Sequence, residues 1–353
     1  TGLRGVGKTV LLGAFREVAA ARQWATVEAE ITTDVEFGMR MAQLLRRALL
    51  NVAPKARWSD RASRAASVLK AFNLRFSPDG SMAVGIDVDA AEGLADSGIL
   101  AEDLTDTFVA LGEAAADNET GVVFLFDEIQ YLDVVELEAL ISALHKTVQR
   151  SLPITLVGAG LPQIPRLAGE AKSYAERLFT FPSIGRLPDD QAAAALAEPA
   201  ARLDVTYESE ALAEITRYTE GYPYFLQEYG KLVWDESPSS PIGLADVRRV
   251  RPLVETHLDS NFFKVRVDRA TDLELRYLRA MAELGPDSHR ANDVARVLER
   301  TSEQLGPVRA RLIAKGLLYT PGHGLAAFTV PQFDQYLIRN FELVVPPRRR
   351  STL

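Results

Sequence analysis

The sequence has 353 residues, enough for two or three compact units that each have their own hydrophobic core. Apolar residues make up 47% and charged residues 25%, which is typical of globular domains and excludes a disordered or fibrous chain. The net charge of −8 argues against a generally polyanion-binding surface. The chain has no cysteine, which excludes disulfides, and its four scattered histidines argue against a zinc site. No stretch approaches the ~18 apolar residues of a membrane-spanning helix, so we expect a cytoplasmic location.

The N-terminal half predicts strands that alternate with helices. Helices are expected at 8–22, 37–52, 103–116 and 134–150, and strands at 24–31, 121–126 and 154–157. The run 121–126 is continuously apolar, which is typical of a strand buried on both faces. This order predicts a parallel sheet covered by helices. Residues 73–88, with Pro78-Asp79-Gly80 at the centre, predict a β-hairpin inserted into this domain.

The C-terminal half predicts helices with one hairpin. An Ala- and Glu-rich region that opens at Pro188 is expected to be helical, and Ser237–Pro241 is expected to form a hinge or loop. Three further helical patterns, near 271–284, 290–299 and 302–315, precede two short strands around Pro321–Gly324. Three helices followed by a hairpin is the order of a winged helix-turn-helix.

The strongest motif is Gly2-Leu3-Arg4-Gly5-Val6-Gly7-Lys8-Thr9, which matches G-x-x-x-x-G-K-[ST] in full. Its glycines let the backbone curl so that N–H groups point at phosphate oxygens, and the following helix adds its positive end. We expect Lys8 to reach the β- and γ-phosphates and the Thr9 hydroxyl to bind Mg²⁺. The expected nucleotide-contacting residues of this segment are Gly2, Gly5, Val6, Gly7, Lys8, Thr9 and Val10. Because the motif normally follows a buried strand, we expect the natural N-terminus to lie upstream of Thr1.

A second motif places Asp127 and Glu128 directly after the apolar run Val122–Phe126. Ligands bind at the carboxyl ends of the strands in an open α/β sheet. We expect Asp127 to hold the metal and Glu128 to orient and polarise the attacking water. The alternative is that the two acids cap the next helix, for which Asp133 is better placed. Both motifs in this order predict ATP and Mg²⁺ as cofactors.

With these motifs the chain resembles the AAA+ ATPases of the replication-initiator (origin-recognition-like) group, and it is also similar to the STAND signalling ATPases. The resemblance covers nearly the whole chain. It implies an α/β fold with a parallel sheet of order 5-1-4-3-2, whose first strand precedes Thr1, and possible ring or filament assembly. The implied parts are a core at 1–187, a helical lid at 188–250, a winged-helix domain at 251–345 and a flexible tail at 346–353.

Three positions of the family pattern differ in how well this sequence matches them. The polar sensor after the fourth strand is missing, because Gly158-Ala159-Gly160 offers no side chain; Thr155 is too early and Gln163 is a possible substitute. Arg177 stands where an arginine reaches into a neighbouring subunit's site, with a surface ion pair to Glu176 or a lid residue as the alternative.

The third position is in the lid. In Gly221-Tyr222-Pro223-Tyr224, Tyr224 replaces the family's sensing arginine, whereas the Gly-x-Pro resembles the STAND motif whose proline packs near the adenine. We therefore assign Pro223 to the nucleotide site, with a proline that simply starts a helix as the alternative.

Basic residues in the C-terminal part raise the possibility of DNA binding. From Arg251 onward, 16 Lys and Arg face 12 Asp and Glu, a balance of +4, so the preceding 250 residues carry −12. Arg309, Arg311 and Lys315 on the helix at 302–315 would contact duplex DNA, with the hairpin near His323 as the wing. A balance of +4 is weak for a DNA-binding domain. The Gly-x-Pro of the lid favours an ATP-driven switch that acts on a protein partner; a DNA-binding initiator-like ATPase and a nucleotide-binding protein with negligible turnover are the alternatives.

Overall fold

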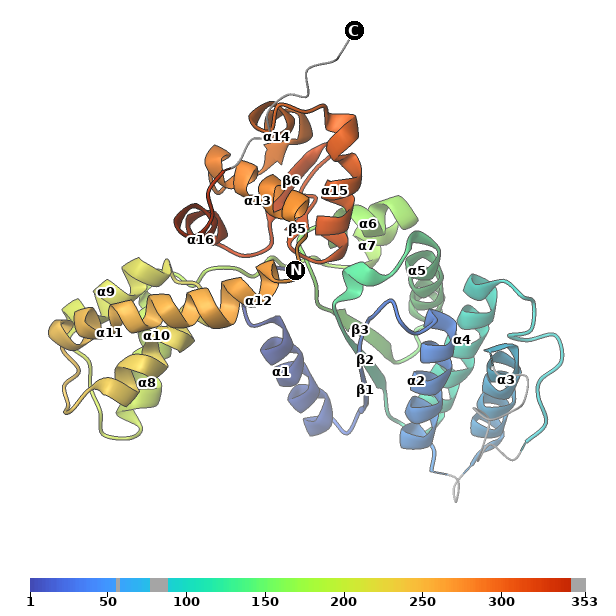
Figure 1. Ribbon diagram of the computed structural model, residues 1–353. Helices are drawn as coiled ribbons and strands as arrows, with labels where there is room; N and C mark the ends of the chain where they lie inside the picture. The colour runs from blue at the N-terminus through green and yellow to red at the C-terminus, as the bar shows by residue number, and fades with distance from the viewer. Residues whose placement is uncertain (55–57, 77–87, 344–353) are drawn as a thin grey trace, which may run out of the picture. The chain divides into compact units, whose positions relative to one another are not determined.

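The computed structural model describes residues 1–54, 58–76 and 88–343, whose helices and strands are drawn in Figure 1. The chain divides into two compact units. The first unit contains Thr1–Gly2 and Lys8–Ser183. The second contains Leu3–Gly7 and the chain from Ile184 onward. No helix of the described residues is long and apolar enough to cross a membrane.

A three-stranded parallel sheet organises the first unit. Its strands are β1 (Ala25–Glu30), β2 (Val122–Asp127) and β3 (Ile154–Gly158), with β2 in the centre. The side chains of the first five residues of β2 are buried, as its apolar sequence predicts for a strand covered on both faces. The parallel sheet expected from the sequence is confirmed.

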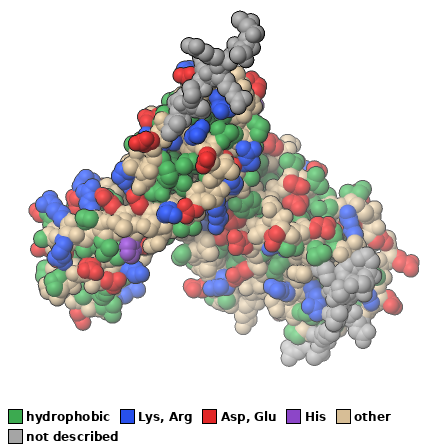
Figure 2. All heavy atoms as spheres, in the orientation of Figure 1, with side chains coloured by type: hydrophobic (Ala, Val, Ile, Leu, Met, Phe, Trp, Pro, Cys, Tyr) green, Lys and Arg blue, Asp and Glu red, His purple; other side chains and the backbone are tan. Residues whose placement is uncertain are grey.

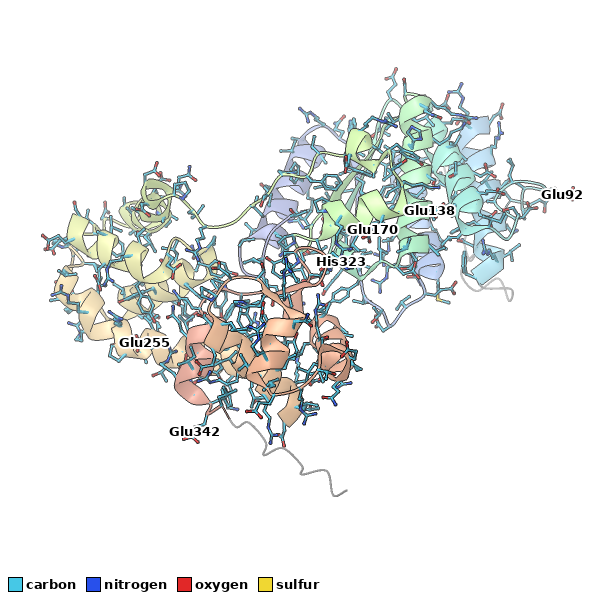
Figure 3. The ribbon with its side chains drawn as sticks, turned by 90° about the horizontal axis from the view of Figure 1, so that it is seen from above. Glu92, Glu138, Glu170, Glu255, His323 and Glu342 are labelled. Atoms are coloured by element: carbon cyan, nitrogen blue, oxygen red, sulfur yellow. The ribbon has the colours of Figure 1, made fainter. Side chains whose placement is uncertain are left out.

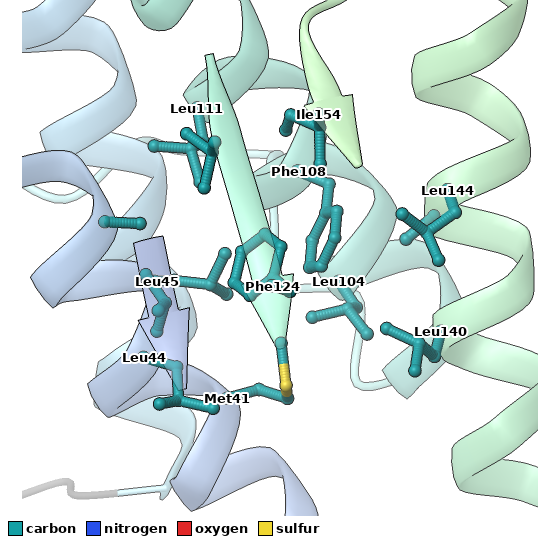
Figure 4. Packing of buried hydrophobic residues seen from close by; sticks show 14 of the residues in the cluster. Met41, Leu44, Leu45, Leu104, Phe108, Leu111, Phe124, Leu140, Leu144 and Ile154 are labelled. Carbon is teal, nitrogen blue, oxygen red and sulfur yellow. The ribbon is translucent and has the colours of Figure 1, made fainter. Parts of the chain in front are cut away.

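Helices cover both faces of this sheet. Phe124 of β2 stacks on Phe108 with ring centroids 5.0 Å apart, in the core shown in Figure 4. Leu12 and Ala19 pack in a separate small cluster with Val123 and Leu125 of β2. Because the side chains of a strand alternate between faces, these two clusters lie on opposite sides of the sheet. The helices of this unit are α1 (Lys8–Ala21), α2 (Phe37–Val52), α3 (Asp60–Phe76), α4 (Leu100–Asp117), α5 (Val134–Gln149), α6 (Ile164–Ala171) and α7 (Ala175–Leu178).

The fifth strand of the expected order is absent from the described residues, because residues 179–188, between α7 and α8, form no strand. The backbone nitrogen of Thr1 donates to the Pro182 carbonyl at 2.6 Å, and that of Gly2 donates to the Gly160 carbonyl at 2.9 Å. The chain start therefore contacts both the loop after β3 and the segment near Pro182, and the expected places of the first and fifth strands stay predictions.

The hairpin expected at 73–88 is wrong at its first residues, because Asn73–Phe76 form the last turn of α3. Residues 77–87 lie outside the described residues, so the rest of the hairpin stays a prediction. Helix α3 buries a face built largely of alanine (Ala62, Ala65, Ala66 and Ala71), whose small side chains give little contrast in a hydrophobicity pattern.

The second unit begins with the helices expected for the lid. These are α8 (Asp189–Ala201), α9 (Ser209–Thr219), α10 (Pro223–Glu236) and α11 (Leu244–His257), and Ser237–Pro241 lies in the connection between the last two. A π-helix, η4 (Leu258–Lys264), and the short α12 (Val265–Val267) continue from α11. Phe262 and Phe263 of η4 pack edge-to-face on Phe225, which ties this segment to α10.

Three helices and a small antiparallel sheet complete this unit. The expected helices correspond to α13 (Asp272–Leu284), α14 (Ala291–Val297) and α15 (Ser302–Ala314), and α16 (Phe333–Asn340) follows. Strands β4 (His289–Arg290), β5 (Leu318–Tyr319) and β6 (Leu325–Phe328) pair in the order β4-β6-β5, with His323 in the turn between β5 and β6 (Figure 3). This arrangement is compatible with a winged helix. The boundaries expected at residues 250 and 345 stay predictions, since residues from 184 onward cluster together.

Candidate functional site

The glycine-rich segment forms a curled loop that leads into α1. Gly5 and Gly7 have φ angles of +86° and +90°, in the region that side-chain-bearing residues rarely adopt. Lys8 is the first residue of α1, only 8% exposed, and its Nζ donates to the Gly2 carbonyl at 3.1 Å. The ammonium group of Lys8 therefore points back to the start of the loop. It lies at the N-terminus of a helix, where anions bind. Val6 is buried at 8% exposure, whereas Val10 is 79% exposed.

The two motifs meet at a single hydrogen bond. The Thr9 hydroxyl donates to Oδ2 of Asp127 at 2.6 Å, although 118 positions separate them in the sequence. A hydroxyl and a carboxylate oxygen this close are the hard oxygen donors that Mg²⁺ uses, and Mg²⁺ usually takes one or two carboxylates besides water and substrate phosphates. Within residues 1–54, 58–76 and 88–343 no group of three His, Asp or Glu could hold a metal alone. The donor set therefore fits Mg²⁺ brought in with a nucleotide.

Glu128 follows Asp127 at the carboxyl end of β2 in an unusual backbone conformation. Its φ of +55° lies in the left-handed region, and its backbone N–H donates to Oδ1 of Asp127 at 2.8 Å. The alternative that these acids cap the next helix is excluded, because Asp133 caps α5 in a capping box with Glu136. Strained backbone of this kind gathers at functional sites, and here it sets the direction in which the Glu128 side chain leaves the strand.

Gln130 is a site residue that the sequence analysis did not find. It lies in the short 3₁₀-helix η3 (Ile129–Tyr131), and its Nε2 donates to Oε2 of Glu128. Its Oε1 accepts the backbone N–H of Leu161 at 3.0 Å. The amide of Gln130 therefore connects Glu128 to the loop that follows β3.

The glycines after β3 make room for this amide. A Cβ at Gly160 would lie 2.3 Å from Oε1 of Gln130, and one at Gly158 would lie 2.9 Å from Ile129. The polar side chain missing at the expected sensor position is thus replaced by the amide of Gln130, which comes from η3. Thr155 lies within β3 opposite Val123, and Gln163 precedes α6 as its N-cap residue.

Arg177 is exposed on the four-residue helix α7. Among the described residues, no ion pair joins Arg177 to Glu176 or to any other acid. The structure thus gives no support to the surface ion pair considered as the alternative role. The assignment of Arg177 to a neighbouring subunit's site stays a prediction.

Within the second unit, residues Leu3–Gly7 contact the start of α10. Tyr224 donates its backbone N–H to the Gly5 carbonyl at 3.1 Å. A Cβ at Gly5 would lie 3.1 Å from Cβ of Tyr224 and 3.2 Å from the Tyr222 ring, so glycine is required there by packing as well as by φ. Pro223 is the first residue of α10, which confirms its helix-starting role and places it beside the residue that binds Gly5.

The basic residues expected to contact DNA are engaged in contacts within the second unit. Glu274 is fully buried, and its carboxylate accepts hydrogen bonds from Nζ of Lys315 at 2.6 Å and Nε of Arg311 at 3.0 Å. Arg309 donates from Nη2 to the Leu325 carbonyl at 2.5 Å. On the face drawn in Figure 2, basic and acidic side chains are interspersed over α13–α16. These contacts do not favour a basic DNA-binding stripe.

The ion pairs of Glu274 also set its ionisation. Burial alone would raise the pKa of this carboxyl, but hydrogen bonds from Lys315, the Thr271 backbone and Arg311 outweigh it and lower the pKa to about 2. Glu274 is therefore an anion throughout the physiological pH range and holds α15 against α13. No pattern in the sequence indicated this network beyond the three charges themselves.

Comparison with known proteins agrees with the motif-based expectation. Residues 1–157 match the family described as AAA ATPase domain, and residues 260–337 match a domain of unknown function, DUF8462. No curated protein matches the chain.

Similar solved structures span most of the chain at low identity. A point mutant of RuvB from Thermotoga maritima is 15% identical, with a TM-score of 0.43 and coverage of 93% of this chain and 83% of that one. Cdc6p from Pyrobaculum aerophilum is 15% identical, with a TM-score of 0.41 and coverage of 96% and 85%. The Aeropyrum pernix Orc1 protein in complex with DNA is 13% identical, with a TM-score of 0.41 and the same coverage. Likeness of this degree does not bear on function.

Proposed function

We propose that this protein, whose residues 1–157 match the AAA ATPase domain family, binds ATP with Mg²⁺ at its glycine-rich loop, hydrolyses it, and acts as a nucleotide-dependent switch. The observation that carries the proposal is the 2.6 Å contact between Thr9 and Asp127. It joins the two sequence motifs at the carboxyl end of the sheet, where α/β proteins bind ligands. Two independent motifs converging on one point are poorly explained by chance.

The residues of the loop would hold the nucleotide phosphates. The backbone N–H groups around Gly7 and the N-terminus of α1 supply fixed positive dipoles. Lys8 would exchange its hydrogen bond to the Gly2 carbonyl for the β- and γ-phosphates, which are stronger acceptors for an ammonium group. Thr9 and Asp127 would hold Mg²⁺, which when bound neutralises charge on the β- and γ-phosphate oxygens.

Glu128 would orient the water that attacks the γ-phosphate, and Gln130 would position Glu128. The hydrogen bond from Gln130 restricts the Glu128 carboxylate to one direction, and the contact of Gln130 with Leu161 fixes the amide in turn. Preorganised groups of this kind act in the transition state without having to reorient. Gln130 is a positioning residue in this scheme, since it acts through Glu128.

A switch fits the second unit better than a DNA-acting machine does. Arg309, Arg311 and Lys315 each bind a group within the second unit, which ties these side chains to the fold and leaves only their remaining N–H groups for DNA phosphates. Pro223 starts the helix whose Tyr224 binds Gly5, which supports its assignment to the nucleotide site. In this proposal ATP binding changes the arrangement of α8–α11 and of the C-terminal module, by which we mean α13–α16 with β4–β6, and a protein partner detects the change.

Nucleotide affinity and turnover test the proposal separately. Lys8→Ala should abolish ATP binding measured by calorimetry, whereas Glu128→Gln should bind ATP like the wild type and lose turnover by about 10²-fold or more. Arg16→Ala on the exposed part of α1 is the matched control for the lost positive charge, and Glu138→Gln on α5 is the control for the lost carboxylate. Unchanged ATP affinity in Lys8→Ala would refute the assignment of the loop.

Duplex DNA distinguishes the switch from the initiator-like alternative. The switch predicts that duplex DNA leaves the rate of ATP hydrolysis unchanged. A DNA-acting ATPase predicts stimulation by DNA, with an affinity that falls steeply as salt rises because phosphate contacts release counterions. Stimulated turnover that Glu128→Gln abolishes would replace the switch by the DNA-acting ATPase.

A further inference from the structure

A pocket of about 220 Å³ opens on the surface of the C-terminal module, and none of the residues assigned to ATP lines it. Its floor is Tyr277 of α13 and Leu305 of α15, each 1% exposed. Its rim includes Gly306 and Ala310 of α15, both exposed, and Ile313 contributes a further apolar wall. The rim is therefore open to solvent, and a ligand would reach the buried floor once the side chains that cover it move aside.

Two buried polar groups in this pocket lack hydrogen-bond partners. The hydroxyl of Tyr277 and Nε of Arg309 are both inaccessible to solvent and unsatisfied. An unsatisfied buried polar group costs about 1–3 kcal/mol, so such groups require an explanation. Arg309 is held by its Nη2, which donates to the Leu325 carbonyl, so its Nε cannot turn away freely.

The chemistry of the two groups indicates what they would bind. Burial raises the pKa of Tyr277 despite the nearby Arg309 charge, so its hydroxyl stays protonated and can donate. The Nε–H of Arg309 is a donor only and carries positive charge. Two donors, one of them cationic, call for an anionic oxygen, and the apolar walls call for an apolar body attached to it. A cavity of about 150 Å³ holds benzene, so this pocket has room for a ring and one small substituent.

We propose that this pocket binds a small aromatic carboxylate, with the carboxylate accepting from Tyr277 and Arg309 and the ring lying against Leu305 and Ile313. The C-terminal module would then carry a small-molecule site of its own. The proposal rests on the pocket and its two unsatisfied donors and does not depend on ATP binding or hydrolysis.

Benzoate is the probe, added to the full chain and followed by the backbone amide signals of Gly306 and Ala310 in NMR titrations. We expect saturable shifts of these two signals at millimolar benzoate or below. Benzamide has the same shape without the charge, toluene has the ring without an acceptor, and acetate has the acceptor without the ring. All three should bind at least tenfold more weakly than benzoate.

Two substitutions separate recognition from folding. Tyr277→Phe removes only the hydroxyl and should lower the affinity for benzoate about tenfold or more, since a hydrogen bond to a charged group is lost. It also removes an unsatisfied buried group, so its melting temperature should not fall. Ala310→Leu should block the pocket, whereas Ala314→Leu, an exposed alanine one turn further along α15 and outside the pocket, should bind benzoate like the wild type.

Three results would overturn the proposal. Equal affinity for toluene and benzoate would show that the two donors take no part in binding. Equal loss of binding in Ala310→Leu and Ala314→Leu would place the effect outside the pocket. No saturable shift up to tens of millimolar benzoate would show that the pocket does not bind an aromatic carboxylate.

Discussion

Replacing the buried Glu274 by glutamine should destabilise the C-terminal module in a manner that depends on pH. A folded pKa of about 2 against the usual 4.5 corresponds to about 3 kcal/mol of stabilisation at pH 7. Arg311 is half-exposed and Lys315 less so, and solvent screens both, so we expect a measured loss nearer 2 kcal/mol.

The sign of the pH dependence follows from the direction of the shift. Because the folded pKa lies below the usual one, the stabilisation is fully present above pH 4.5 and disappears as the pH falls toward 2. In the Glu274→Gln variant the side chain at position 274 is neutral at every pH. The difference in stability between wild type and variant should therefore be largest at pH 7 and fall to less than half of that value at about pH 3.

Calorimetry at several pH values measures this difference, since it can separate the unfolding transitions of the two units. Glu283→Gln on the same helix is the control: its carboxylate pairs with Arg279 but is 44% exposed, and it should change stability by no more than about 0.5 kcal/mol. A loss in Glu274→Gln that is the same at pH 3 and pH 7 would show that the stabilisation is not electrostatic.

Three further predictions concern the lid and the nucleotide-binding half. Gly221→Ala should cost about 2–3 kcal/mol in a thermal unfolding assay, because φ is +68° and a Cβ would lie 2.2 Å from the Leu187 carbonyl oxygen; Gly306→Ala, with open space and a helical backbone, should be neutral or stabilising. Gln130→Ala should lower kcat for ATP hydrolysis about tenfold and leave the Kd for ATP unchanged, and equal loss in both would reduce Gln130 to a structural role. Arg177→Ala should lower turnover only at protein concentrations where chains associate, by about 10³-fold or more if it completes a neighbour's site, and an identical loss in dilute monomer would exclude that role.

The sequence was sufficient to predict the nucleotide motifs and most of the elements that carry them. A phosphate-binding loop is made by consecutive residues, so its pattern survives without knowledge of the fold. The contact of Thr9 with Asp127 was also predictable, because the carboxyl ends of parallel strands meet at one edge of the sheet. Long apolar runs such as Val122–Phe126 placed their strands within a residue or two.

Features that depend on contacts between distant residues were not predictable in the same way. Gly158 and Gly160 indicated a missing polar sensor, whereas in the fold their lack of side chains admits Gln130 from a different element. The left-handed backbone of Glu128 had no sequence signal, since glutamate rarely adopts it. In both cases the residue type alone was ambiguous, and only the packing around it decided its role.

Charge counting illustrates the same limit for the C-terminal module. Its excess of +4 suggested a surface that could attract DNA, but several of the positive charges hold the module together. Arg279 is buried and donates to the Phe341 carbonyl, Arg309 donates to the Leu325 carbonyl, and Arg311 and Lys315 share Glu274. The balance of +4 already counts Glu274 against these cations, so it is a small net charge for a DNA-binding domain. The contacts add that these side chains are tied to the module, which a count of charges along the sequence could not reveal.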